Sequence, residues 1–500
     1  EGKYQDGNGK FYDYLMIRDS LFSEKIKKKK LVIDTIIPKI WYPNKSNGLA
    51  KKLNSKTILF KNATLWTNEE IGIVNTGDIV ISNGKIIAIG ENLDTNQIPN
   101  FENLNIEILN AKGKHITSGI IDEHSHIAIN RGVNESSQAV TAEVSISDVI
   151  NPDDHNIYRQ IAGGVTCSQL LHGSANPIGG QSALIKLRWG GSAEDMKIKD
   201  CDGFIKFALG ENVKQSNWGS FNTTRFPQTR MGVEQVFFDA FYRAKNYQQE
   251  WLNYNKLSLR KKREVNPPRE DLELNTLVEI LEGKRHITCH SYIESEINML
   301  MHVADSMDFK INTFTHILEG YKIANKLKKH GAGASTFSDW WAYKFEVNDA
   351  IPYNAAMLNK SGVVTAINSD DAEMGRRLNQ EAAKAVKYGN TSEEEAWKMV
   401  TLNPAKLLHL DDRMGSLKVG KDADIVIWSD NPLSIYSKVE QTYIDGNCYF
   451  DYQNNILTQN RDAKEKIRII NKLSKIKGGG KVKNKQVKDK LYHCDSIEHE

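Results

Sequence analysis

The sequence predicts an α/β protein: a (β/α)8 TIM barrel with a small composite β-sandwich domain formed from both ends of the chain. Two observations support this prediction. Short apolar runs alternate with helical stretches through residues 119–411, and strand-rich segments stand on both sides of that region. Strands alternating with helices are typical of parallel βαβ units, and eight such units close a barrel. We therefore expect an irregular lead-in (1–56), the first part of the β-domain (57–118), the barrel (119–411), the second part of the β-domain (412–455) and a polar, lysine-rich tail (456–500).

The composition is that of a globular protein and excludes several classes. Hydrophobic residues make up 40% of the 500 residues and charged residues 26%, while the net charge of +3 is too small to argue for nucleic acid or a membrane surface. The 5 cysteines are few and widely spaced, so we expect neither a disulfide framework nor a structural zinc site. No apolar run is long enough to span a bilayer and no signal peptide is visible, so the compartment stays unassigned.

The first β-domain segment begins with the alternating pattern of residues 57–66. Further on, Asn83-Gly84 separates two apolar runs at 77–82 and 85–89. Both central positions of a tight two-residue hairpin need positive φ, which Asn and Gly adopt readily. The pair therefore predicts a β-hairpin.

The barrel region contains eight candidate strands, and one connection in it is unusually long. Residues 211–270 do not fit a short loop, and insertions after a barrel strand lie on the face where active sites form, so this stretch is a candidate lid or substrate wall. The expected strands are 119–127, 164–171, 182–188, 203–209, 286–291, 311–316, 333–337 and 363–369.

Helix and turn signals continue to the end of the barrel and beyond it. Thr391 to Glu394 has the pattern of a capping box, and Asn403-Pro404 predicts a helix with proline at its first position. Strand patterns return at 424–428 and 441–450, with Asp445-Gly446 as a turn.

Metal-ligand residue types stand at the ends of five of the expected strands. His124 and His126 are two apart, so they project to the same side of the first strand. A lysine lies inside the fourth strand, and single polar residues end the fifth, sixth and eighth. Barrel catalytic residues occupy this position, and imidazole and carboxylate bind divalent metals. The candidate ligands are His124, His126, Lys206, His290, His316 and Asp370.

In this order, the constellation resembles that of the amidohydrolase superfamily: H-x-H on strand one, lysine on strand four, histidines on strands five and six, and aspartate on strand eight. The stretch 415–427 and the β-domain built from both termini also resemble that family. The resemblance covers residues 55–455 and is closest to imidazolonepropionase-like and prolidase-like branches. It implies a divalent metal, with Zn²⁺ favoured, as one ion or as two bridged by a carboxylated Lys206. The alternative is that Lys206 points outward and the site holds a single metal.

The chemistry that follows is hydrolysis of a C–N bond, in an amide or a cyclic amide, by a metal-activated hydroxide. Asp370 is the expected proton shuttle, with its neighbour Asp371 as the competitor. Deaminase branches of the family carry H-x-x-E on strand five, whereas here Ile293 stands at that position and Glu294 one residue later. A deaminase therefore remains the alternative, and a catalytically inactive barrel used for binding is the third possibility.

Three further residues are candidates for contacting a substrate. His172 follows the second strand in a glycine-containing loop that could equally be a structural turn. Arg225 and Arg230 could clamp a carboxylate, because guanidinium binds it bidentately, or could be surface residues of the insertion. His115, His155, His302, His330 and His409 belong to no constellation, so we expect structural roles. The expected partner is a small-molecule or short-peptide substrate, without nucleic acid or membrane, and a homo-oligomer is open.

Overall fold

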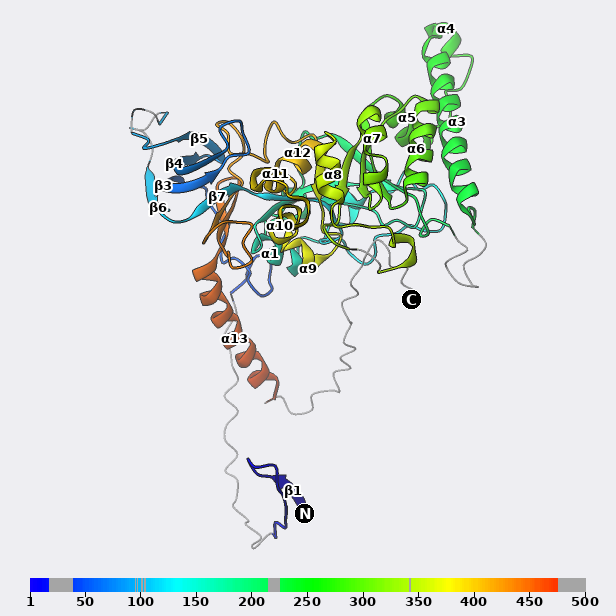
Figure 1. Ribbon diagram of the computed structural model, residues 1–500. Helices are drawn as coiled ribbons and strands as arrows, with labels where there is room; N and C mark the ends of the chain where they lie inside the picture. Colours follow the sequence, from blue (N-terminus) through cyan, green and yellow to red (C-terminus); the bar gives the residue numbers. More distant parts are fainter. Residues whose placement is uncertain are drawn as a thin grey trace. The chain divides into compact units, whose positions relative to one another are not determined.

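The computed structural model describes residues 1–17, 39–94, 96, 98–99, 102, 105–214, 225–340 and 343–474 (Figure 1). The chain divides into two compact units. One contains Glu1–Pro38 with Lys464–Lys483, and the other contains Lys39–Ala463 with Asn484–Glu500. All residues of the candidate site lie in the second unit. Among the helices of these described ranges, none has the length and apolar character needed to cross a bilayer.

Two terminal segments are more ordered than the sequence suggested. The lead-in was expected to be irregular, but β1 (Gly2–Gln5) and β2 (Phe11–Tyr14) form an antiparallel hairpin in which Tyr4 stacks on Tyr12 at 5.2 Å between ring centroids. The expected tail starts with a helix, α13 (Tyr452–Ser474), which has no buried residue. The prediction of an irregular lead-in was therefore wrong for these strands. The tail prediction described only composition, and local pairs such as Arg468–Glu465 stabilise the exposed helix with which this segment begins. Residues 475–500 lie outside the described ranges.

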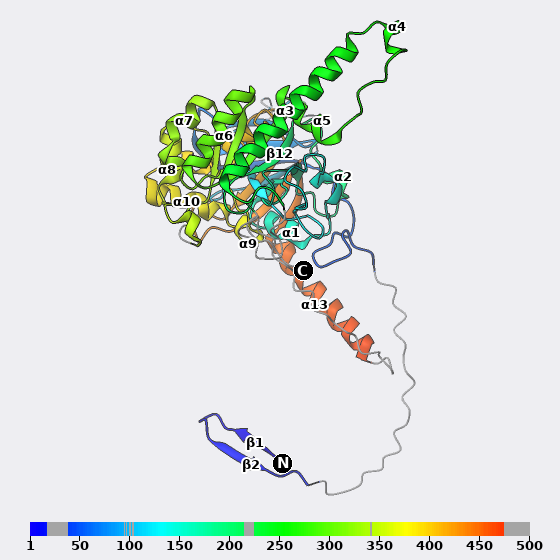
Figure 2. The ribbon, with the colours of Figure 1, turned by 90° about the vertical axis from the view of Figure 1, so that its right-hand side faces the viewer.

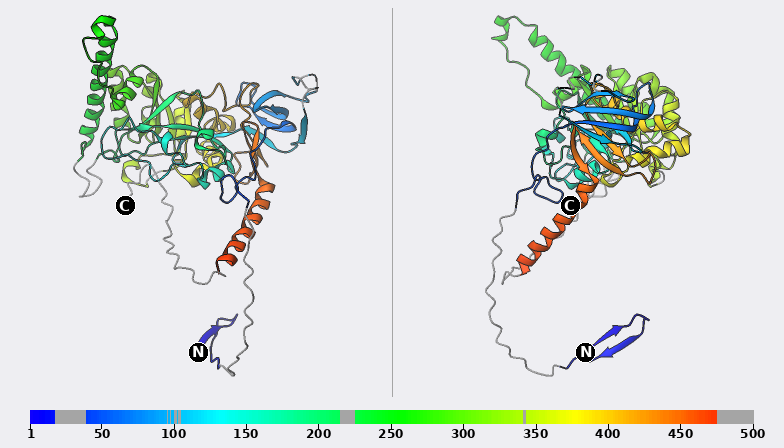
Figure 3. Two further views of the ribbon diagram at one scale, coloured as in Figure 1. Left: turned by 180° about the vertical axis from the view of Figure 1, so that it is seen from behind. Right: turned by 90° about the vertical axis from the view of Figure 1, so that its left-hand side faces the viewer.

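One eight-stranded sheet joins the two ends of the second unit, as the blue and orange strands of Figure 3 show. Its order is β19-β18-β17-β7-β3-β4-β5, with β6 paired to β3. The junction is the antiparallel pair β7–β17. The strands are β3 (Thr57–Trp66), β4 (Ile73–Ser82), β5 (Lys85–Gly90), β6 (Ile106–Asn110), β7 (His115–Ser118), β17 (Ile425–Trp428), β18 (Val439–Ile444) and β19 (Asn447–Asp451).

Both predicted turns of this sheet are confirmed. Asn83 and Gly84 have φ of 49° and 78°, and β4 pairs antiparallel with β5 across them. Asp445 and Gly446 have φ of 48° and 70° between β18 and β19. The positive φ values explain why these short polar and glycine residues stand there.

All eight expected strands of the central region are present. β8 pairs parallel with β9, and β12 to β16 form a continuous parallel series. The third strand differs from expectation, because β11 runs antiparallel to β9 and an additional strand, β10, runs antiparallel to β12. The strands are β8 (Ile120–Ser125), β9 (Val165–Leu170), β10 (Ile178–Gln181), β11 (Ala183–Lys186), β12 (Gly203–Ala208), β13 (Arg285–Ser291), β14 (Ile311–His316), β15 (Gly333–Thr336) and β16 (Thr365–Ile367).

Helices surround these strands, and the helix of the long insertion is one of them. In α3 (Arg230–Asn255), Phe237 and Phe241 pack on Phe207 of β12, whose side chain points away from that of Lys206. The far end of α3 extends from the barrel region together with α4 (Leu259–Lys262) (Figure 2). The buried residues of α3 run from Gly232 to Tyr247, so this part of the expected lid packs on the core. Residues 215–224 lie outside the described ranges. The other helices are α1 (His155–Ile161), α2 (Ala193–Met196), α5 (Leu272–Leu281), α6 (Glu294–Met307), α7 (Ala324–His330), α8 (Asn354–Lys360), α9 (Ala372–Gly375), α10 (Leu378–Gly389), α11 (Glu393–Lys398) and α12 (Leu402–Leu407).

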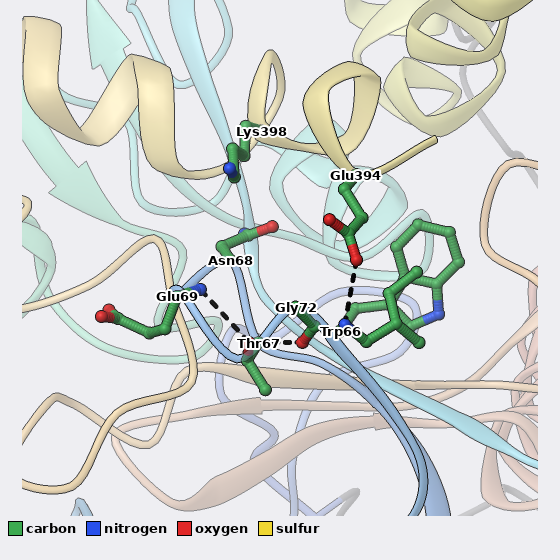
Figure 4. Close-up of a pocket in the computed structure, with 8 residues that line it drawn as sticks. Trp66, Thr67, Asn68, Glu69, Gly72, Glu394 and Lys398 are labelled. Atoms are coloured by element: carbon green, nitrogen blue, oxygen red, sulfur yellow. Dashed lines mark hydrogen bonds between the residues drawn. The ribbon is translucent and has the colours of Figure 1, made fainter. Parts of the chain in front are cut away.

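The predicted capping box is displaced by one residue, for a reason visible in Figure 4. Ser392, not Thr391, caps α11, and its side chain accepts from the Glu395 amide. Glu394 instead accepts from the Ile73 amide at 3.0 Å, beside the turn in which Thr67 donates to the Gly72 carbonyl at 2.6 Å. The carboxylate therefore ties α11 to the start of β4. The next helix, α12, likewise begins at Leu402, two residues before Pro404.

A buried lysine joins β11 to the eight-stranded sheet. Lys186 is fully buried, and its Nζ lies 2.7 Å from Asp422, 2.9 Å from Asp424 and 2.5 Å from Asp445. Burial lowers the pKa of Lys186, but these three carboxylates outweigh it and raise the pKa above its usual range. A charge buried without partners is very costly, so the four side chains are stable only together.

We expect Lys186→Met to lower the free energy of unfolding by about 3–5 kcal/mol, because three carboxylates lose their common partner. The denaturant midpoint measures the change. Lys85→Met is the matched control, since Lys85 also pairs with Asp422 but its side chain is 49% exposed. That variant should lose less than about 1 kcal/mol, and equal losses in both would contradict the assigned role.

Candidate metal centre

Three polar side chains meet at the ends of β8 and β16. His124 lies in β8, His126 directly follows it, and Asp370 follows β16. Asp370 Oδ1 is 3.4 Å from His124 Nε2 and 3.2 Å from His126 Nε2. The three ligand atoms lie within 4.8 Å of one another, which is close enough for one ion to touch all three.

The structure also brings the other three predicted ligands to this place. Lys206 Nζ is 3.0 Å from His124 Nε2, so the alternative that this lysine points outward is wrong. The His316 ring lies 4.5 Å from that of His124 and 4.9 Å from that of His290, and His316 Nε2 is 3.9 Å from Asp370 Oδ2. All six side chains are at most 3% exposed. Four different strands and the segment after a fifth therefore converge on one buried site.

Two of these residues have an unfavourable backbone conformation. His316 has φ of 67° and Asp370 has φ of 51°, in the left-handed region that residues with a side chain seldom adopt. Such positions cost about 1–3 kcal/mol each and persist where the surrounding structure enforces them, often at functional sites. The strain turns both side chains into the site at the strand ends.

Hydrogen bonds hold the ends of β8 and β16 together. The Asp370 amide donates to the His124 carbonyl at 3.0 Å. The Ser369 hydroxyl donates to Asp122 at 2.5 Å, and the Ser369 amide donates to the same carboxylate at 3.1 Å. Burial raises the pKa of Asp122 to about 7, although the bonds from Ser369 oppose the shift. Asp122 thus positions the segment that carries Asp370.

Contacts behind the two histidines set which ring nitrogen faces the site. His126 Nδ1 lies 2.9 Å from the Leu171 carbonyl, which only accepts, so Nδ1 carries a hydrogen and, in a neutral ring, Nε2 has the lone pair. His124 Nδ1 lies 3.0 Å from the Thr315 hydroxyl, which in turn donates to Glu123 at 3.3 Å. Thr315 therefore accepts from His124, and the Nε2 lone pair of His124 also faces the site. Burial keeps the pKa of His124 well below its usual value, which favours the neutral ring.

This arrangement fits a cation. The Nε2 lone pair of His126 faces a carboxylate oxygen of Asp370 at 3.2 Å, and two acceptors this close in a buried site repel each other unless a positive charge lies between them. Neutral imidazoles oriented from behind by carbonyl and hydroxyl groups are the usual environment of metal-binding histidines. His124, His126 and Asp370 could hold one ion, with His290, His316 and Lys206 beside them.

Aromatic side chains form one side of the site. Phe337 stacks on His316 at 4.5 Å, Tyr292 lies 4.6 Å from His290, and Trp340 stacks on Phe337 at 4.5 Å. The stack on Phe337 places Trp340 one ring further from the ligands. Sequence reasoning missed Phe337, Tyr292, Thr315 and Asp122. Only Asp122 had a signal, since it precedes His124 by two residues and so shares its face of the strand.

The three candidate substrate contacts are occupied by other protein groups. Burial lowers the pKa of His172 to about 4; its Nε2 accepts from the Glu135 amide and its Nδ1 donates to the Gly173 carbonyl, both at 2.8 Å. Arg225 donates to the carbonyls of Ser136, Gln138, Ala175 and Val213. Arg230 pairs with Glu296 and Glu346. These contacts indicate structural roles, and substrate binding by the three residues stays a prediction without support.

Asp371 and Glu294, the two acidic residues that the sequence left as alternatives, have other roles in the structure. Asp371 caps α9 and accepts from the amides of Glu373 and Met374, both at 2.8 Å, while Asp370 faces the histidines. Glu294 is the first residue of α6, and its amide donates to Glu319 at 2.9 Å. The competition between the neighbouring aspartates is therefore resolved in favour of Asp370 as the one in the site.

The chain belongs to the amidohydrolase family, which has a TIM-barrel-like α/β fold. Residues 349–449 match the model of that family. The chain is 33% identical to a solved amidohydrolase from Thermotoga maritima MSB8, covering 79% of this chain and 100% of that one with a TM-score of 0.70. It is 31% identical to amidohydrolase tasK of Hapsidospora irregularis, over 79% of this chain but 43% of that relative. An imidazolonepropionase of Thermoplasma volcanium is 32% identical over 115 residues, which are 21% of this chain and 28% of that enzyme.

We expect Thr315→Val to weaken metal binding by about 10–100-fold, because the His124 ring loses the hydroxyl that orients it. Competition with a chelating dye measures the affinity. Thr365→Val is the matched control, since the hydroxyl of this buried strand threonine donates to the Val363 carbonyl, at 3.0 Å. Equal affinities in the Thr315 variant and the wild type would show that the hydroxyl does not orient the ring.

Proposed function

We propose that this chain is a metal-dependent hydrolase that cleaves the C–N bond of an amide or a cyclic amide. The observation that carries the proposal is the convergence of His124, His126 and Asp370, with two ring lone pairs and a carboxylate oxygen facing one another. Family membership supports the reaction class. The imidazolonepropionase relative favours a cyclic amide, although it matches only part of this chain.

The expected metal is Zn²⁺, because neutral imidazole and carboxylate are its usual ligands. When bound, such a cation lowers the pKa of a water molecule from 15.7 to about 7 and polarises a carbonyl oxygen. His124, His126 and Asp370 would hold one ion. His290 and His316 would contribute to a second, with Lys206 carboxylated on Nζ as the shared ligand. In this fully buried position, 3.0 Å from His124 Nε2, carboxylation would replace the ammonium by an anion that two cations could share.

Asp370 is the residue we assign to proton transfer. Its carboxylate would take the proton of the attacking water and deliver it to the leaving nitrogen, because it lies at the centre of the site and not on its rim. The side chains of Phe337 and Tyr292 pack against His316 and His290 and so help to exclude water from that side. A small-molecule or short-peptide substrate suits a site of this kind.

We also propose that the eight strands close into one barrel between residues 119 and 411, and that residues 57–118 and 412–455 form one composite β-domain. The hydrogen bond from Asp370 to His124 supports closure between the first and eighth strands. The pairing of β7 with β17 supports the composite domain.

The proposal is tested by metal analysis of the purified chain together with a screen of dipeptides, N-acyl amino acids and imidazolone- or hydantoin-type rings. Hydrolysis should require the bound metal and stop when a chelator removes it. Release of ammonia from a heterocycle, without amide cleavage, would favour the deaminase alternative. Bound metal without turnover of any of these compounds would leave the third possibility, a barrel used for binding.

Metal stoichiometry should depend on Lys206. We expect two ions per chain in wild type, and one or none in Lys206→Ala, because the bridging ligand is lost. Bicarbonate should raise the occupancy of wild type alone. Lys206→Arg is the matched control, since it keeps the positive charge but cannot be carboxylated. Unchanged metal content and activity in both variants would leave a mononuclear site.

Asp370→Asn should lower the turnover number by about 10²–10⁴-fold, the usual range for a lost acid–base group. The fold should survive, because the exchange is nearly isosteric. Metal content must be measured in the same sample, since Asp370 is also a ligand. Asp371→Asn is the control, because asparagine caps a helix about as well as aspartate. Equal and mild effects in both variants would place the proton shuttle elsewhere.

A further inference from the structure

A second group of metal-ligand side chains lies at the other end of the strands. Asp202 immediately precedes β12, His286 is the second residue of β13, and His409 follows α12. We call these three residues the Asp202 cluster. His286 and the candidate ligand His290 are four residues apart on the same strand, which corresponds to about 13 Å. The cluster is therefore separate from the centre described above.

The three side chains meet around one carboxylate oxygen. Asp202 Oδ2 is 2.7 Å from His409 Nδ1 and 3.3 Å from His286 Nε2. The two imidazole rings are 4.4 Å apart, and the buried Phe204 ring packs at 5.6 Å from each of them. The three ligand atoms lie within 4.8 Å of one another. With metal–ligand bonds of about 2.0–2.1 Å, a tetrahedral ion places its ligands roughly 3.3 Å apart. This equals the separation of His286 and Asp202, while the 2.7 Å between His409 and Asp202 would lengthen on binding.

Contacts of Asn312 decide the protonation of His409. The Asn312 amide nitrogen donates to Thr313 at 3.0 Å and to the Leu407 carbonyl at 2.8 Å, so its oxygen is the atom 3.0 Å from His409 Nε2. That oxygen only accepts, and Nε2 must therefore carry a hydrogen. In a neutral ring the remaining nitrogen, Nδ1, then has a lone pair that faces the Asp202 carboxylate at 2.7 Å.

Two acceptors at that distance require a positive charge, which is either a proton on Nδ1 or a bound cation. Among the described residues, Asp202 makes no ion pair with a lysine or arginine. The carboxylates of Asp422, Asp424 and Asp445 differ in this respect, because Lys186 lies among them and supplies the positive charge. The Asp202 cluster offers two imidazoles and a carboxylate, the ligand types that Zn²⁺ prefers.

The backbone and the surface position also fit a binding site. His409 has φ of 55°, in the left-handed region where the residue after a helix is usually glycine or asparagine. A histidine in that conformation directs its ring toward Asp202 and His286. The side chain of Asp202 is 51% exposed, that of His409 33% and that of His286 24%, so an ion can enter and solvent can complete its coordination.

We propose that the Asp202 cluster binds one divalent transition-metal ion, Zn²⁺ in preference to Mg²⁺ or Ca²⁺, through Asp202, His286 and His409. The ion links three segments that are far apart in the sequence, at the starts of β12 and β13 and at the end of α12. A ligand that binds only the folded chain stabilises it. Because the cluster is also separate from the catalytic centre, we assign the ion a structural role and no part in the reaction.

The test uses the full chain carrying His124→Ala, His126→Ala, His290→Ala and His316→Ala, so that metal in the catalytic centre does not obscure the result. Zn²⁺ is titrated by calorimetry and retained zinc is measured by mass spectrometry after gel filtration. We expect one Zn²⁺ per chain in this background, and at least a tenfold loss of affinity after adding His286→Gln or His409→Gln. His302→Gln is the matched control, because His302 is an exposed histidine on α6.

A second measurement separates binding from a folding defect. In chains with an intact catalytic centre, saturating Zn²⁺ at the cluster should raise the melting temperature of wild type by about 2–4 °C over the His409→Gln variant. Turnover should stay unchanged in that variant. Equal zinc affinity in the parent, the His286→Gln and the His409→Gln chains would overturn the proposal and leave a protonated His409 paired with Asp202. Loss of turnover in the His409→Gln variant, while its catalytic centre keeps its zinc, would also contradict the proposal.

Discussion

The site depends on the hydrogen bonds that hold the end of β16 against the end of β8. The Asp122 carboxylate accepts from Ser369 twice, and the His124 carbonyl accepts from the Asp370 amide. These bonds join segments about 250 residues apart and turn Asp370 into a left-handed conformation that it would not adopt alone. Without them, a carboxylate and two imidazoles would not face one another at hydrogen-bonding distance.

Two buried lysines show how the surroundings decide what one residue type does. Lys186 lies among three carboxylates, so it remains an ammonium group and ties β11 to the eight-stranded sheet. Lys206 lies beside the ring nitrogen of His124, in a site where four further histidine or aspartate side chains converge. The first environment stabilises the positive charge. The second suits a ligand more than a cation, which is why we assign Lys206 to the metal centre.

Much of the architecture could be predicted, because strands and turns leave local patterns. The eight candidate strands and both glycine turns were predicted correctly. The antiparallel direction of β11 was not, because strand direction depends on pairing and not on composition. The helix of residues 452–474 was also missed, since its exposed surface has the composition of a tail. His409 was expected to stand alone, yet it meets His286 and Asp202, which lie more than 100 residues away in the sequence.

The sequence by itself determined the ligand types and their order along the chain. The two-residue period of a strand places His124 and His126 on one face, and the alternation of strands with helices brings the strand ends to one edge. Only the tertiary structure decided that Lys206 points inward, that Asp370 and not Asp371 enters the site, and that Arg225 and Arg230 are bound to protein groups. Those outcomes depend on hydrogen bonds and packing between distant segments. A local pattern cannot encode such contacts, because each requires a partner that only folding supplies.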